Sequence, residues 1–150
     1  MCNERPSGEG DEKKRMRPIP IGAKGYFEAV VRREDLANTF KDATLPPILS
    51  TPVMIKFMEN AALRAIRPYL DAKETAVGTA INVRHLAATP LGRRVRAEAE
   101  VTEVDGHRVS FTVRAADDQH EIGAGTHERR VIDAARMARG MEAAEKNDTP

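Results

Sequence analysis

The residues of this sequence best suited to chemistry are a carboxylate, a hydroxyl and an imidazole: Glu59, Thr51 and His85. A carboxylate can act as a general base or as a nucleophile, and a histidine can carry a proton near neutral pH. A hydroxyl can orient either of these partners. The three groups can act together only if the fold brings the elements that carry them side by side.

Glu59 lies in a stretch with helical periodicity, but outside the polar stripe of that helix. At about 100° per residue, its neighbours on the helix surface are apolar: Ile55, Ala62, Leu63 and Ile66. A buried carboxylate has to be paired, hydrogen-bonded or protonated, because its desolvation costs several kcal/mol. Two interpretations stay open. Glu59 reaches water or an arginine at the edge of the buried face, or it is a general base or nucleophile with a tuned pKa.

His85 and Thr51 also have simple structural interpretations. His85 shares one face of a predicted strand with Thr79, Ile81 and Val83. A histidine placed among aliphatic residues is more often a core residue with one hydrogen bond than a catalyst. Thr51 stands at the start of the helix, where a hydroxyl can cap free backbone N–H groups.

The helix that carries Thr51 and Glu59 is well delimited by the sequence. Ser50 or Thr51 can cap its start, and Pro52 then occupies the first helical position, where its missing N–H costs nothing. Pro68 cannot continue the hydrogen-bond ladder, so the helix is expected to end near Arg67. Its broad apolar face predicts burial on nearly all sides.

The remaining segments alternate apolar and polar residues as antiparallel strands do. Strands are expected at 22–33, 75–88 and 121–132, and two more form a hairpin around Asp105-Gly106. One buried helix, one strand before it and four strands after it make an α+β domain in which an antiparallel sheet wraps around one long central helix.

Composition limits the class of protein. The 150 residues suit one domain, and 24 Lys plus Arg against 23 Asp plus Glu give no charge excess that would favour nucleic acid or a membrane surface. The single Cys2 offers no disulfide and no metal cluster, which favours a reducing, cytoplasmic setting. We expect a disordered leader at 1–20, the folded domain at 21–133, and a short C-terminal helix with a frayed tail at 134–150.

Three segments together resemble the hot-dog fold thioesterases of the fluoroacetyl-CoA thioesterase type. The segments are Ser50-Thr51-Pro52-Val53 leading to Met58-Glu59, Val77-Gly78-Thr79-Ala80-Ile81 leading to His85, and Glu121-Ile122-Gly123-Ala124-Gly125-Thr126-His127-Glu128-Arg129. The resemblance runs from about Tyr26 to Ile132 and includes an uncommon Gly-Thr-His-Glu-Arg run.

The resemblance implies a role for each matching residue. It assigns the catalytic Thr, Glu and His of that family to Thr51, Glu59 and His85. It places Gly78 at the thioester and coenzyme A, and Arg129 at the substrate side of the pocket. It also implies a homodimer with the acyl pocket at the subunit interface, and coenzyme A as part of the substrate with no metal or other cofactor.

These residues suit an acyl-CoA thioesterase, because a thioester needs an attacking oxygen, a proton carrier and donors for the oxyanion. The stretch 42–49 lacks the aromatic residues with which the fluoroacetyl enzyme closes its pocket, so we expect another short- or medium-chain acyl-CoA as substrate. The alternative is a non-catalytic hot-dog module that binds an acyl-CoA or acyl group. A hot-dog dehydratase or hydratase is less favoured, because no Asp and His pair stands at the helix start.

Overall fold

The computed structural model describes residues 17–148. Within that range the strands are β1 Lys24–Val30, β2 Glu74–His85, β3 Arg94–Asp105, β4 Arg108–Ala116 and β5 Glu121–Asp133. The helices are α2 Ala37–Phe40, α3 Thr51–Ile66 and α4 Ala134–Asp148, with 3-10 turns η1 Arg33–Asp35 and η2 Arg67–Tyr69. The predicted order of elements is confirmed.

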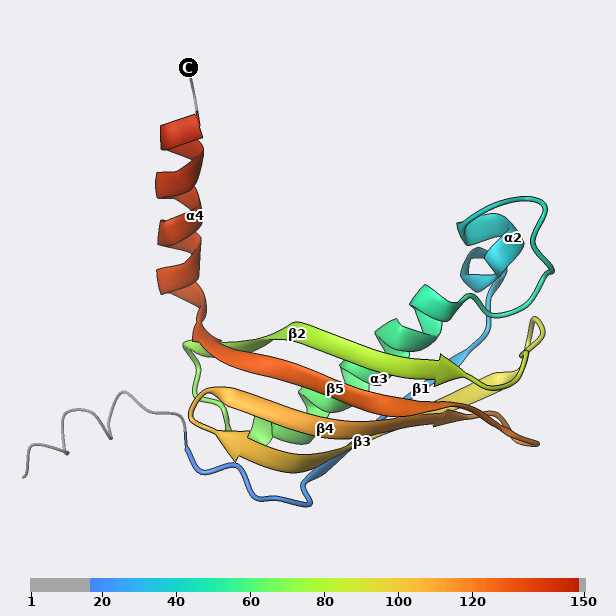
Figure 1. The fold of residues 1–150 in the computed structure, drawn as a ribbon, viewed down its shortest axis with the longest axis horizontal. Coiled ribbons are helices and arrows are strands. Elements are labelled where there is room, and N and C mark those ends of the chain that lie inside the picture. The colour runs from blue at the N-terminus through green and yellow to red at the C-terminus, as the bar shows by residue number, and fades with distance from the viewer. Residues whose placement is uncertain (1–16, 149–150) are drawn as a thin grey trace, which may run out of the picture.

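The strands form one antiparallel sheet in the order β1-β3-β4-β5-β2, curved around α3 (Figure 1). The tight turn between β3 and β4 is made by Gly106, whose φ of 61° lies in the left-handed region that glycine adopts without strain. This confirms the predicted α+β architecture of a sheet wrapped around one long helix.

The helix α3 begins and ends where the sequence predicts. Ser50 occupies the N-cap position, and Pro52 lies in the first turn. The buried side chains are Val53, Met54, Phe57, Met58, Ala61, Ala62, Ala65 and Ile66. Burying a large apolar side chain stabilises a fold by roughly 1.5–3 kcal/mol, so this face anchors the domain. The predicted burial on nearly all sides is wrong, because Ile55, Glu59 and Leu63 are only half-buried.

The half-buried edge of α3 faces β5 and β2, on the side of the sheet that the helix covers least. The helix packs mainly on β1 and β3 and much less on β5 and β2. The strand β2 is also an edge strand, and its residues 78–82 are exposed. The inner face of β2 therefore remains accessible beside α3.

A β-bulge interrupts the pairing of β2 with β5. Gly78 pairs with Arg129 and Ala80 with Glu128, so Thr79 is an extra residue without a partner. The Thr79 hydroxyl bonds to Glu128, away from the face on which Ile81 pairs with His127. The prediction that Thr79 shares a face with Ile81 and His85 is wrong, because a bulge shifts the alternation by one residue.

The two ends of the domain differ from expectation in extent. Most of the predicted leader at 1–20 lies outside the described residues, but Ile19 is 5% exposed and belongs to the core. The folded part therefore begins before residue 21. The helix α4 continues to Asp148, further than the short helix expected within 134–150, and projects away from the sheet with its described side chains exposed (Figure 1).

Candidate functional site

The first pair of predicted site residues is in direct contact. Thr51 is the first residue of α3, and its Oγ1 lies 2.9 Å from Nδ1 of His85 at the end of β2. Thr51 is therefore not the N-cap, and its hydroxyl faces the strand rather than the free backbone N–H groups of the helix. The pair joins the start of α3 to the edge strand.

His85 is placed to exchange a proton with something other than Thr51. Its Nε2 is buried and makes no hydrogen bond within the described part of the chain. Burial lowers the pKa of His85, and the main chain of Ala87 opposes this shift. A neutral imidazole with one free nitrogen can accept or deliver a proton.

The second group of predicted site residues gathers two turns further along α3. Glu59 Oε2 lies 3.4 Å from Arg129 Nη1, with the Glu59 side chain 39% exposed and that of Arg129 8% exposed. The surroundings of Glu59 are thus not only apolar as predicted, because the guanidinium of Arg129 on β5 compensates its charge. The open interpretation of Glu59 as an edge residue paired with an arginine fits this contact.

Arg129 is fixed by two further contacts inside the domain. Its Nη2 donates to the main-chain oxygen of Ala76 at 2.6 Å, and its Nη1 lies 3.1 Å from Nε2 of His127. Nδ1 of His127 lies 2.8 Å from the main-chain oxygen of Ala80. A carbonyl only accepts, so Nδ1 carries the proton and Nε2 accepts from Arg129.

His127 is a site residue that the sequence did not single out beyond its place in the Gly-Thr-His-Glu-Arg run. It is 3% exposed and connects β2 to Arg129. Its position two residues before Arg129 could have indicated that it lies beside Arg129, because residues i and i+2 of a strand share a face.

Gly78 lies where a side chain would obstruct this group. A Cβ built at Gly78 would be 3.1 Å from Glu59 Oε2, 3.4 Å from Cε1 of His127 and 3.6 Å from Arg129 Nη1. The backbone of β2 is thus bare next to the carboxylate. A backbone N–H in such a position is a candidate donor for an oxyanion.

The predicted residues therefore form two groups along one edge of α3. Thr51 lies with His85, and Glu59 lies with Gly78 and Arg129. No hydrogen bond or ion pair links Glu59 to His85 among residues 17–148. An extended substrate that lies along β2 could contact both groups.

Other features of the described chain lie apart from these groups. Among residues 17–148, no three His, Cys, Asp or Glu side chains are grouped to hold a metal ion. No helix in that range is long and apolar enough to cross a membrane. A surface hollow of about 1010 Å³ lies between the loop before β2, the end of β5 and α4, and none of the predicted catalytic residues lines it.

The fold is the hot-dog fold. A hot-dog-like protein from Thermanaerovibrio acidaminovorans superposes with a TM-score of 0.76 over 84% of this chain and 93% of its own, at 24% identity. The solved structure of the fluoroacetyl-CoA thioesterase FlK superposes with a TM-score of 0.79 over 89% of this chain and 99% of its own, at 36% identity.

The family is defined by sequence as well. The model of the fluoroacetyl-CoA-specific thioesterase family matches residues 31–135, and the chain belongs to this family. The fluoroacetyl-CoA thioesterase of Streptantibioticus cattleyicolor is 49% identical over 90 residues, which are 60% of this chain. The chain spans just under two thirds, 65%, of that relative.

Proposed function

We propose that the protein hydrolyses the thioester of a short- or medium-chain acyl-CoA to the free acid and coenzyme A. The observation that carries this proposal is the half-exposed Glu59, which is held by Arg129 against the bare backbone of Gly78. An oxygen base beside a potential oxyanion donor is what the attack on a thioester carbonyl requires.

Each residue has a part in the proposed reaction. Glu59 removes a proton from water, or attacks the carbonyl carbon itself, and the N–H of Gly78 is a candidate donor to the oxygen that becomes negative. The carbon–sulfur bond then breaks, and the departing thiolate takes a proton. His85, with a free Nε2 and with Thr51 on Nδ1, is suited to relay that proton: the neutral imidazole first accepts one from the attacking water or from solvent, and then passes it to the thiolate.

The acyl group is proposed to be short or medium in length rather than only fluoroacetyl. The chain supplies no aromatic residue between 42 and 49, and Phe40, the nearest one, is 53% exposed. In the same loop Leu45 is 37% exposed. A pocket bordered by aliphatic side chains does not demand one acyl group of fixed shape.

We propose that the active form is a homodimer with the acyl pocket at the subunit interface. The exposed edge strand β2 and the partly uncovered inner face of the sheet support this proposal. A second copy would cover the side of α3 that carries Glu59 and Thr51. It would also enclose a thioester that one chain leaves open to water.

No metal or redox cofactor is proposed, and coenzyme A enters only as part of the substrate. Hydrolysis assisted by a carboxylate and a histidine needs neither group. Turnover should therefore survive prolonged treatment with a chelator, and a loss of turnover that added metal restores would contradict this. We also propose a cytoplasmic location, which rests on the single Cys2.

The function is tested by measuring free thiol release from a panel of acyl-CoA substrates of increasing chain length. We expect turnover of at least one short or medium member. Glu59→Gln should lower it by roughly 100- to 10,000-fold, because the amide cannot take a proton. Coenzyme A binding should survive in that variant. Binding without turnover in the wild-type protein would support the non-catalytic module instead.

A further inference from the structure

The bulge in β2 determines which residues face the site. Gly78 and His85 are an odd number of positions apart, so a regular strand would direct them to opposite faces. The unpaired Thr79 between them shifts the alternation by one residue. Gly78 consequently lies against Glu59 on the face where His85 contacts Thr51.

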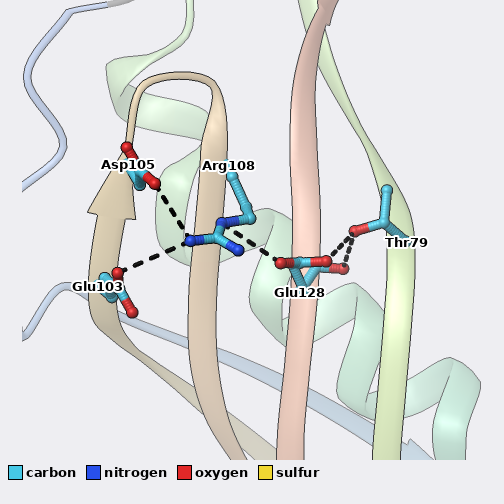
Figure 2. Close-up of polar contacts among 5 residues, drawn as sticks. All are labelled: Thr79, Glu103, Asp105, Arg108 and Glu128. Carbon is cyan, nitrogen blue, oxygen red and sulfur yellow. Dashed lines mark hydrogen bonds and ion pairs between the residues drawn. The ribbon is translucent and has the colours of Figure 1, made fainter.

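The bulge is held on the outer face of the sheet, away from Glu59. Figure 2 shows the Thr79 hydroxyl pointing to Glu128 on the neighbouring strand. Its Oγ1 lies 2.9 Å from Glu128 Oε2 and 3.2 Å from the Glu128 main-chain oxygen. A hydroxyl carries one proton, and the shorter contact is to a charged acceptor, which makes the stronger bond. We call this contact the outer clasp.

The outer clasp is tied to the rest of the sheet through Arg108. Arg108 Nε lies 3.4 Å from Glu128 Oε1, and its Nη2 lies 3.2 Å from Asp105 and 3.8 Å from Glu103 (Figure 2). A single ion pair on a surface contributes little to stability. A network that shares one arginine fixes the Glu128 carboxylate better than an isolated pair does.

Arg108 also connects the clasp to a second bulge. The pairing of β3 with β4 shifts between Val101 and Glu103, and one row of residues crosses the sheet from there to the first bulge. The row consists of Glu103, Ser110, Glu128 and Ala80. Two bulges in one row bend the sheet locally, and Arg108 joins their carboxylates on the outer side.

The geometry points to Thr79 and Glu128 as positioning residues that hold the bulge and thereby place Gly78 beside Glu59. Neither side chain touches the site, since both lie on the opposite face of the sheet. Their effect passes through the backbone of β2, whose displacement by about 1 Å can cost about 100-fold in rate. The inference rests on the proposed function for its rate effect and on the fold alone for the bulge.

The test compares Thr79→Val, which keeps the shape and loses the hydroxyl, with Thr79→Ser, which keeps the hydroxyl. Thr112→Val is the matched control, because Thr112 is an exposed threonine on β4 with no side-chain hydrogen bond in the described structure. The readouts are kcat and KM on the best acyl-CoA of the panel, and amide hydrogen exchange of the segment 76–82. Thermal unfolding monitors the fold.

We expect Thr79→Val to lower kcat by about 10- to 100-fold with little change in KM, and to speed exchange in the segment 76–82. Thr79→Ser and Thr112→Val should stay near wild type. Glu128→Ala should give the same loss as Thr79→Val, and the double variant should be no worse than either. Glu128→Ala also decides the matter if Thr79→Val does not fold.

Wild-type kcat with unchanged exchange in Thr79→Val would overturn the inference, as would an equal loss in Thr112→Val or in Thr79→Ser. A wild-type protein that hydrolyses no acyl-CoA would remove the proposed function instead. In that case the exchange measurement still decides whether Thr79 and Glu128 hold the bulge.

Discussion

At the scale of single residues, the contact between Thr51 and His85 separates two roles for a hydroxyl at the helix start. A cap would bond backbone N–H groups of α3, yet the Thr51 hydroxyl lies 2.9 Å from Nδ1 of His85. The Ser50 side chain, at the cap position, makes no capping hydrogen bond. The hydroxyl of Thr51 therefore orients the imidazole rather than the helix.

Thr51→Ser should keep most of the turnover, and Thr51→Val should lower it by about 10-fold or more, because only serine can still hold Nδ1 of His85. Initial rates of thiol release would measure this. Thermal stability should change little in either variant, since Thr51 is exposed and makes no cap. Equal rates for the serine and valine variants would remove Thr51 from the site.

The hydrogen bonds of His127 show which of its ring nitrogens carries the proton. Nδ1–H donates to the oxygen of Ala80, and the lone pair of Nε2 accepts from Arg129. A second proton on Nε2 would face the guanidinium donor directly. Burial, chiefly, lowers the pKa of His127. The charge of Arg129 adds to this shift, whereas the hydrogen bond to Ala80 and, less strongly, the charges of Glu59 and Glu128 oppose it.

Stability should therefore fall in mild acid. A group whose pKa is lower in the folded chain takes up its proton first in the unfolded chain, so acidification favours unfolding. The free energy of unfolding should be level above the ordinary histidine pKa of about 6.5 and should decline as the pH falls below it.

Urea unfolding at several pH values between neutral and mildly acidic would measure this decline. In His127→Gln the decline of stability towards mild acid should be smaller. The part that remains should come partly from His85, because burial lowers its pKa as well. A stability that rises between neutral pH and mild acid would contradict the neutral assignment of His127.

At the scale of elements, the packing of α3 on β1 depends on Gly25, which has no side chain. A Cβ at Gly25 would overlap the backbone of α3 at Ala61 and Ala65. Gly25→Ala should destabilise the fold by about 1–3 kcal/mol, because helix and strand would have to move apart. Gly140→Ala, in α4 with open space around it, should be neutral or slightly stabilising.

Chemical denaturation of the two variants would check this contrast. The Gly25 variant should also lower turnover of the folded protein, because the α3 backbone that it displaces at Ala61 is two residues from Glu59. A Gly25→Ala variant as stable as wild type would show that β1 does not lie directly on α3.

The sheet and the long helix could be predicted because they follow periodic patterns. In β3, for example, Val95, Ala97 and Ala99 alternate with charged residues, as the inner face of a strand does, and the structure has all three buried. The bulge at Thr79 could not be predicted in this way. An extra residue in a strand leaves the composition unchanged, and only the pairing with β5 reveals the shift.

The candidate site residues could be chosen from the sequence, but their arrangement could not be predicted. Thr51, Glu59 and His85 were chosen by residue type and resemblance, and the structure places them at one edge of α3. The pairing of Glu59 with Arg129 depends on which strand lies opposite the helix, which no local pattern encodes. The role of His127 depends on the same long-range contact.

At the scale of the whole molecule, the edge strand β2 predicts a homodimer. Ile81 is 39% exposed and Leu86 is 54% exposed, and an unpaired strand edge with apolar side chains invites a partner. Sedimentation at micromolar concentration should give twice the 16.5 kDa mass of the chain.

Ile81→Lys should shift the equilibrium towards monomer and lower turnover together, because a charge would enter the interface. Ile21→Lys provides the matched control, since Ile21 is 69% exposed and precedes β1 at the other side of the sheet. A wild-type protein that sediments only as a monomer would contradict the dimer and the interfacial pocket.

The position of β2 at the sheet edge affects how the chain folds during its synthesis. Within residues 17–148, β2 pairs only with β5, and β3 and β4 are synthesised between them. A nascent chain therefore exposes the strand that carries Gly78 and His85 until nearly the whole domain has left the ribosome. A chain terminated after β4 would lack β5, so its candidate site would not form. Such a chain should show no thiol release.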